Sequence, residues 1–231
     1  LRMNTSQVII NEARPQLTKH LATRFKEKIG QNVNLLGEVV LGNGEADHRY
    51  HHYLEALESP DINYISVKIS GIYAQTHALN YEESFPELVS RMSALYQKAI
   101  DFPYTDEDGI KRSKFINLDM EEYKDAHFTL RLFKAVLNLP QFKNYSAGIV
   151  VQAYLPDAYD FQTELLEFAK ARVDGGGAPI KMRLVKGCNL EMETVISSLK
   201  GWPNPIRPSK TEVDANYLCL LERGLMPENA R

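Results

Sequence analysis

Residues 180–193, IKMRLVKGCNLEME, begin as a β-strand that carries charged side chains. Ile180, Met182 and Leu184 alternate with Lys181 and Arg183, so the two sets lie on opposite faces of a strand. The buried strands of an α/β protein usually read as near-continuous apolar runs. A charge in such a strand must be paired or bound, because an unpaired buried charge is costly. The stretch therefore predicts a strand in which Arg183 holds another group.

Four earlier segments repeat this pattern of one aliphatic and one polar face, at residues 33–40, 63–70, 115–121 and 147–155. Their polar residues of matching parity are Asn34 and Glu38, then Ser66, Lys68 and Ser70, then Asn117, Asp119 and Glu121, and finally Gln152. In each strand a polar residue lies toward the carboxyl end. The aliphatic faces are suited to covering helices, and the polar faces need another explanation.

Amphipathic helical patterns separate and follow these strands. They cover residues 44–58, 83–100, 125–138, 158–173, 191–200 and 209–224, the last capped by Ser209. Residues 1–30 are expected to form a separate helical segment, broken around Pro15 and stopped by Gly30. Residues 31–231 then hold the alternating strands and helices.

This alternation predicts a parallel sheet with right-handed crossovers. A dinucleotide-binding sheet would carry a glycine fingerprint just after a strand, whereas DGGGAP, residues 174–179, precedes one. The polar faces favour a TIM-like (β/α)8 barrel, which turns one face of each strand inward and gathers the carboxyl ends around one mouth. Because a complete barrel has eight strands in about 250 residues, we expect a barrel truncated after about five β/α units.

The composition argues against several classes of protein. With 27 basic and 30 acidic residues the net charge is −3, which is not the basic balance of a nucleic-acid binder. Two cysteines, Cys188 and Cys219, fit a reducing, cytoplasmic compartment rather than a disulfide scaffold. No apolar run reaches the roughly 20 residues of a membrane helix. His48, His51 and His52 share one predicted helix without convergent ligands, so we expect no metal site.

The segments SVKIS, NLDMEEY, GIVVQAYLPDA, RLVKGCNLEME and PSKTEVDANY occur in the order and spacing of the proline dehydrogenase family. LLGEVVL followed by EADHRYHHYLEAL is similar to the first strand and helix of that domain in the bifunctional proline utilisation A enzymes. The resemblance spans about residues 30–220. It implies a distorted (β/α)8 barrel that binds FAD and oxidises L-proline to Δ1-pyrroline-5-carboxylate, by hydride transfer to flavin N5, on the route from proline to glutamate.

The resemblance also implies a quinone as electron acceptor, and we expect a homo-oligomer with peripheral contact at the inner face of a membrane. The residues that match flavin contacts are Gln152, Arg183, Val185, Lys186 and Gly187, with Ser209 and Lys210 near the ADP part. Arg183 would reach the flavin near N5, where a fixed guanidinium stabilises the charge of the reduced ring. Lys68 would attract the proline carboxylate, Asp119 would position cationic side chains, and Glu38 and Glu121 would support the pocket.

Three positions depart from the family pattern: Asn34 replaces an acidic residue, and Asn189 and Leu190 replace an aromatic pair. The family's carboxylate-binding arginine pair and pocket tyrosine are expected to follow Arg231, so this chain alone is not expected to turn over proline. In bifunctional relatives an NAD-dependent aldehyde dehydrogenase domain accompanies the barrel. Two other interpretations remain open: a Schiff-base lyase or aldolase that uses Lys68, and a structural barrel fragment without a cofactor.

Overall fold

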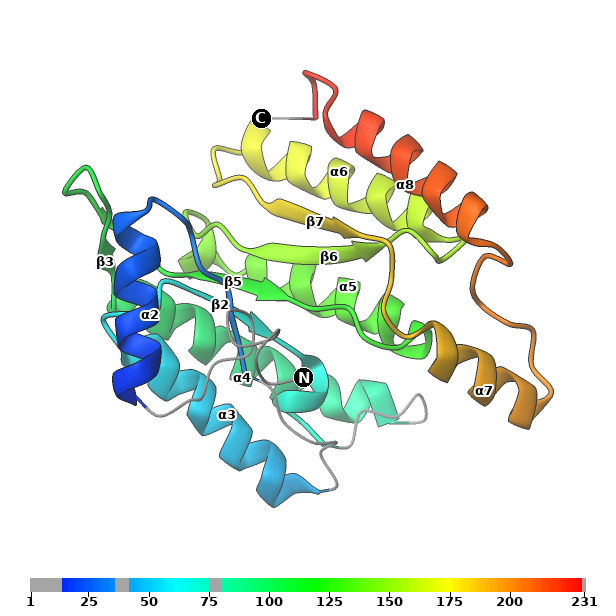
Figure 1. Cartoon of the computed structure of the whole chain (residues 1–231), viewed down its shortest axis with the longest axis horizontal. Coiled ribbons are helices and arrows are strands. Elements are labelled where there is room, and N and C mark those ends of the chain that lie inside the picture. The colour runs from blue at the N-terminus through cyan, green and yellow to red at the C-terminus, as the bar shows by residue number, and fades with distance from the viewer. Residues whose placement is uncertain (1–13, 36–41, 75–79, 230–231) are drawn as a thin grey trace.

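A sheet of five parallel strands forms the centre of the molecule, in the order β1-β2-β5-β6-β7. The computed structural model of the chain describes residues 14–35, 42–74 and 80–229 (Figure 1). The strands are β1 (Val33–Asn34), β2 (Tyr64–Val67), β5 (Phe115–Leu118), β6 (Gly148–Gln152) and β7 (Lys181–Val185). Because sheet order follows chain order and a helix lies in each connection, the predicted series of β/α units is confirmed.

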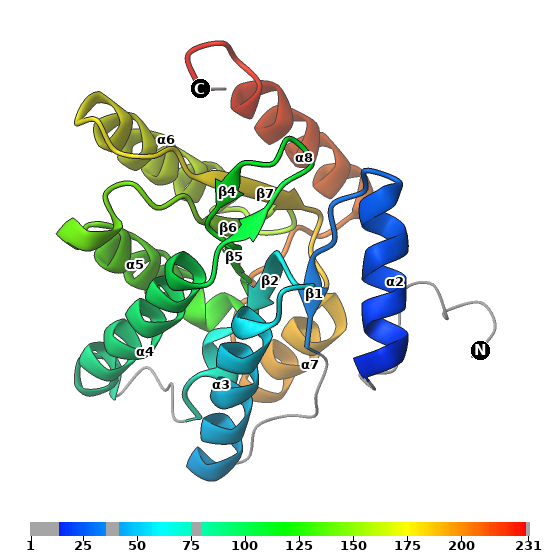
Figure 2. The same ribbon diagram turned by 90° about the vertical axis from the view of Figure 1, so that its left-hand side faces the viewer.

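Helices surround the outer side of this sheet. Figure 2, which looks along the strands, shows α3, α4, α5 and α6 fanned around it. In the described residues the helices are α2 (Arg14–Lys26), α3 (Asn43–Glu58), α4 (Tyr81–Asp101), α5 (Ala126–Leu137), α6 (Ala158–Asp174), α7 (Leu190–Lys200) and α8 (Lys210–Gly224). Helix α8 packs beside α6 and against β7, whereas α7 lies beyond the carboxyl ends of the strands (Figure 1). Helix α7 is therefore an insertion between β7 and its covering helix.

The core lies between the outward face of the sheet and these helices. The buried outward-facing strand residues are Ile65, Val67, Ile116, Leu118, Ile149 and Val151. The helices contribute the buried residues Leu57, Leu88, Met92, Leu95, Leu130, Phe133, Val136 and Leu165. Each fully buried side chain of this kind contributes roughly 1.5–3 kcal/mol, so the aliphatic parity read from the sequence fixes which face of each strand meets the helices.

The strands are shorter than the sequence indicates. Strand β2 ends at Val67, and the chain then turns as a 3₁₀ helix, η1 (Ile69–Gly71). Strand β5 ends at Leu118 and is followed by the turn η3 (Tyr123–Asp125). The polar residues that follow these strands are thus carried on the first residues of the connecting loops, where the backbone leaves the ladder. Residues 36–40 of the first predicted strand, Glu38 among them, lie outside the described residues.

One element at the amino end of the sheet was not predicted. β3 (Tyr104–Thr105) and β4 (Lys111–Arg112) pair as an antiparallel hairpin. Its strands are two residues long, too short to show an alternating pattern. The hairpin lies at the opposite end of the sheet from α7 (Figure 1) and takes no part in the site.

Two predictions about helix ends are confirmed. The Ser209 hydroxyl caps α8 by accepting a hydrogen bond from the backbone N–H of Glu212 at 3.2 Å. The DGGGAP segment closes α6: the Gly175 N–H donates to the carbonyl of Ala171, and Gly176 turns the chain with φ +74°.

Candidate active site

Inward-facing side chains form layers across the sheet. The register places Asn34 beside Ser66, Ser66 beside Asn117, and Asn117 beside Gly148. A Cβ on Gly148 would lie 2.7 Å from Oδ1 of Asn117, so a glycine on β6 makes room for the neighbouring amide. One step nearer the carboxyl ends, Val150 of β6 lies beside Arg183 of β7. The predicted polar faces therefore meet on one side of the sheet.

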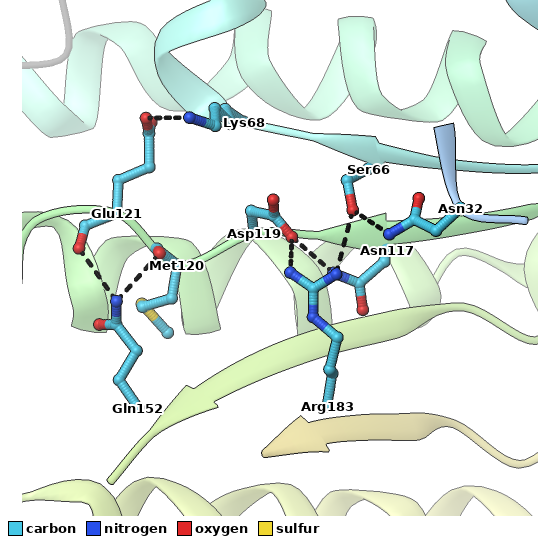
Figure 3. A network of polar contacts seen from close by, with 9 residues as sticks. All are labelled: Asn32, Ser66, Lys68, Asn117, Asp119, Met120, Glu121, Gln152 and Arg183. Carbon is cyan, nitrogen blue, oxygen red and sulfur yellow. Dashed lines mark hydrogen bonds and ion pairs between the residues drawn. The ribbon is translucent and has the colours of Figure 1, made fainter. Parts of the chain in front are cut away.

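An ion pair between Asp119 and Arg183 occupies the centre of this face (Figure 3). Nη2 of Arg183 lies 2.6 Å from Oδ1 of Asp119, and Nδ2 of Asn117 donates to the same oxygen at 2.8 Å. The Asp119 side chain is 10% exposed and that of Arg183 is 38% exposed. Burial raises the pKa of the Asp119 carboxyl, and the Arg183 guanidinium opposes that rise. The group that Arg183 was predicted to hold is therefore, in this structure, the carboxylate of Asp119.

Strand β2 supports the pair from the other side. Nη1 of Arg183 reaches Oγ of Ser66 at 3.4 Å, and Nδ2 of Asn32 donates to the same hydroxyl at 2.9 Å. Ser66 is fully buried. The guanidinium therefore lies between groups of β2 and β5 while its own backbone belongs to β7.

Lys68 and Glu121 form a second ion pair nearer the mouth (Figure 3). Nζ of Lys68 lies 3.6 Å from Oε1 of Glu121, and Oγ of Ser70 donates to Oε2 at 2.6 Å. The Lys68 side chain is 37% exposed. A lysine ammonium has three N–H donors, so in this position it can pair with Glu121 and still donate to an anionic ligand at the mouth.

Gln152 ends β6 and is buried below these pairs. Its Nε2 donates to the carbonyls of Met120 and Glu121 at 3.2 and 3.3 Å, which fixes the amide. Its Oε1 is buried without a hydrogen-bond partner among the described residues. Nε of Arg183 is likewise buried and unpartnered there. An orphaned acceptor and an orphaned donor on one inward face suit a ligand that presents both kinds of group, because buried polar atoms are normally satisfied.

The predicted run Val185–Gly187 follows directly along the end of β7. Val185 pairs with Gln152 in register, and its carbonyl accepts from the N–H of Ala153 at 2.8 Å. Gly187 has φ +126°, and a Cβ there would lie 2.4 Å from Cγ of Tyr154. The glycine is therefore required by the buried ring beneath it and by its own backbone conformation.

Lys186 and Lys210 converge on one carboxylate at the start of α8. Their Nζ atoms lie 2.5 Å from Oδ1 and Oδ2 of Asp214 respectively, and these hydrogen bonds hold the pKa of Asp214 below its ordinary value. The two lysine side chains are 51% and 81% exposed. Ser209 next to them serves as the helix cap. The structure thus brings the last two predicted residues together with Lys186, at the outer rim of the site.

Sequence reasoning missed four supporting residues, Asn32, Tyr154, Asp214 and Asn216. Tyr154 shares the parity of Gln152, and Asp214 lies four residues after Lys210 on a predicted helix, so periodicity could have indicated both. Asn216 is buried, and its Nδ2 donates to the carbonyl of Ala153 at 2.8 Å. That contact joins residues far apart in the chain, and no local pattern marks it.

These features define an α/β barrel-type enzyme domain, with charged side chains gathered where parallel strands end. The sequence profile of the family described as "Proline dehydrogenase" matches residues 17–231. The chain belongs to the proline dehydrogenase family. The fold accordingly corresponds to the (β/α)8 barrel-like fold of that domain, as predicted.

Solved structures support the same assignment. Proline utilization A from Corynebacterium freiburgense is 41% identical, with a TM-score of 0.90 over 99% of this chain and 23% of that chain. Proline utilization A from Bdellovibrio bacteriovorus, inactivated by N-propargylglycine, is 30% identical, with a TM-score of 0.77 over 92% of this chain and 23% of that chain. This chain thus spans about a quarter of the length of these proteins. A comparison with curated proteins finds no match.

No helix within residues 14–35, 42–74 and 80–229 is long and apolar enough to cross a membrane. In the same ranges no group of three His, Cys, Asp or Glu side chains could hold a metal ion.

Proposed function

We propose that this chain provides the FAD-binding and much of the proline-binding surface of a proline dehydrogenase. The observation that carries the proposal is the set of buried, unpartnered polar atoms beside the Asp119–Arg183 pair, on a fold that belongs to this family. In the proposed reaction the C5–H bond of L-proline breaks as a hydride, the ring nitrogen loses a proton, and a C=N bond forms. FAD, when bound, accepts that hydride.

The residues present fit a flavin. Oε1 of Gln152 can accept from an imide N–H, and Nε of Arg183 can donate to a ring nitrogen or carbonyl. A guanidinium fixed by Asp119 stabilises negative charge on a reduced ring without moving, which is electrostatic preorganisation.

Lys68 and Glu121 fit the substrate end of the site. We assign Lys68 to the proline carboxylate, with Glu121 holding the ammonium in place and Ser70 donating a hydrogen bond to Glu121. Asp119 positions Arg183 and does not contact the substrate in this proposal. Lys186, Lys210 and Ser209 lie at the outer rim, where cations suit a pyrophosphate. The electron acceptor is a quinone, reached through peripheral contact with a membrane, and the protein works as a homo-oligomer.

A Schiff-base mechanism on Lys68 has less support. A nucleophilic lysine is activated by desolvation or by a second cation. Lys68 instead lies 3.6 Å from a carboxylate and is more than a third exposed. Borohydride trapping with carbonyl substrates tests this alternative directly, and a lysine adduct on residue 68 would favour it.

The test is a visible absorption spectrum of the purified protein with FAD, followed by addition of proline. It is run on this chain and on any longer protein that contains it. We expect flavin bands in the protein fraction, and bleaching by proline wherever the substrate site is complete. Arg183→Met should weaken FAD binding, whereas Arg112→Met, an exposed arginine in the β3–β4 hairpin, should not. A folded protein that takes up no FAD in either form would refute the proposal and favour a purely structural barrel.

A further inference from the structure

The ends of β6 and β7 are tied together at Tyr154. Its N–H donates to the carbonyl of Lys186 at 2.8 Å, and its own carbonyl accepts from the N–H of Arg207 at 2.8 Å. The preceding residue, Ala153, donates to the carbonyl of Val185 at 2.8 Å. These bonds continue the parallel ladder beyond the last strand residues and join it to the segment that leads into α8.

The ring of Tyr154 lies directly against Gly187. A Cβ on Gly187 would meet Cγ, Cδ1 and Cδ2 of that ring at 2.4, 2.5 and 2.7 Å. The segment Val185–Gly187 therefore packs against the ring. The position of this segment relative to the sheet depends on that aromatic side chain. Real Cβ atoms essentially never approach a ring so closely, so only glycine fits at position 187.

The ring itself cannot easily move. Tyr154 is 1% exposed, and the carbonyls on either side of it, those of Ala153 and Leu155, accept hydrogen bonds from Nδ2 of Asn216 at 2.8 and 3.4 Å. Asn216 belongs to α8, the helix that covers β7. The backbone on both sides of the buried ring is thus fixed by hydrogen bonds from Asn216 of α8.

The contact with Gly187 is made by carbon atoms of the Tyr154 ring and not by its hydroxyl. Burial raises the pKa of that hydroxyl, and the nearby backbone of Asn189 and side chain of Gln152 oppose the rise. The packing surface of the ring is therefore the part that supports Gly187.

We infer that Tyr154 is a positioning residue for the flavin. Its ring sets the position of the Val185–Gly187 run, and so the position of the protein surface that contacts the isoalloxazine. This inference rests on the proposed function, because that run is the predicted flavin contact. If this binding surface shifts by a fraction of an ångström, the ligand binds more weakly and its absorption spectrum changes. Tyr154 does not touch the reacting atoms.

The first experiment measures FAD affinity by flavin fluorescence titration, and the visible spectrum of the bound flavin, for three variants. Tyr154→Leu should weaken FAD binding about 10-fold and blur the structured absorption of bound flavin. Tyr154→Phe keeps the ring and should bind FAD as the wild type does. Tyr96→Leu is the matched control: Tyr96 is equally buried with an unpartnered hydroxyl, but it packs against Phe142 and Tyr145 away from the site.

A second pair of variants approaches the same contact from the other side and does not depend on how Tyr154→Leu folds. Gly187→Ala forces a methyl group into the ring of Tyr154. Gly201 also has a positive φ, of +65°, but a Cβ added there would meet no atom within 4 Å. Both substitutions strain the backbone, and only Gly187→Ala should weaken FAD binding.

The outcomes separate the two proposals. Wild-type FAD affinity in both Tyr154→Leu and Gly187→Ala, with a loss in Arg183→Met, would overturn the role of Tyr154 and leave the proposed function intact. An equal loss in Tyr154→Phe and Tyr154→Leu would overturn the role of the ring, because the hydroxyl would then be the determinant. A folded wild type that does not bind FAD would refute the proposed function itself.

Discussion

Replacing Arg183 by methionine tests the electrostatics of the site without any cofactor. The substitution keeps much of the aliphatic stem and removes the guanidinium that lies 2.6 Å from Asp119. Asp119 then keeps the hydrogen bond from Asn117 but loses its nearest cation. We expect the variant to fold and to be less stable than the wild type at neutral and alkaline pH.

The size of the loss follows from the burial of the two groups. Removing one partner of a fully buried ion pair typically costs 3–5 kcal/mol, because the other charge is left uncompensated. Asp119 is 10% exposed, but Arg183 is 38% exposed, so water already screens part of the attraction. We therefore expect a loss of about 1–3 kcal/mol at pH 8.

The pH dependence gives the sharper signature. Burial already raises the pKa of Asp119, and loss of the guanidinium raises it further. Between its ordinary value of 3.8 and that raised value, the folded protein binds more protons than the unfolded chain. The free energy of unfolding of the variant must then fall as the pH rises through this window, so the loss is smaller at acidic pH than at pH 8.

The assay is urea denaturation at a mildly acidic pH and at pH 8, for the wild type, Arg183→Met, Asp119→Asn and the double variant. In the double variant the buried charge is gone, so its stability should depend on pH less than that of Arg183→Met and exceed it at pH 8. An equal loss for Arg183→Met at both pH values, or no recovery in the double variant, would refute the reasoning.

Three further predictions follow from particular contacts. Lys114 is 1% exposed, its Nζ donates to the carbonyl of Ser59 at 2.5 Å, and burial lowers its pKa to about 8 from 10.5. Between pH 8 and 10.5 the unfolded chain therefore binds more protons than the folded protein. The free energy of unfolding of the wild type, relative to that of Lys114→Met, should rise by at most about 3 kcal/mol across this range. Urea titrations at stepwise pH measure this rise. Arg172 donates to five backbone carbonyls, so Arg172→Lys should cost about 2–4 kcal/mol in urea denaturation, because an ammonium cannot reach all five; Arg223→Lys, which loses one such bond, is the control and should cost far less. Lys68→Met in the active holoenzyme should raise the KM for proline about 10-fold or more at unchanged FAD affinity, and a parallel loss of FAD would contradict the assignment of Lys68 to the carboxylate.

The order of elements could be read from the sequence because it depends on local patterns. The helical stretches 158–173 and 191–200 agree with α6 and α7 to within a residue at either end, since each shows its own apolar period. Strand ends were less predictable. Residues 65–70 alternate throughout, but pairing with β5 ends at Val67 because the chain then turns into η1 (Ile69–Gly71).

Parity along a strand decides which face a side chain joins, so the sequence could indicate which residues gather in the candidate site. Arg183 and Gln152 lie on β7 and β6, and Lys68 and Asp119, each one residue past the end of its strand, gather with them on the same side of the sheet (Figure 3). The roles assigned to them, and to Glu38 outside the described residues, remain predictions that the variants above test.

The sequence by itself determined the succession of strands and helices and the polar face of each strand, because those properties depend on neighbours a few residues away. Only the tertiary structure decided the partners. Arg183 meets Asp119 across 64 residues and Ser66 across 117, and Lys68 meets Glu121 rather than Asp119. Such pairings depend on the register between strands and on how far each side chain reaches across the sheet, and no period along one strand records either.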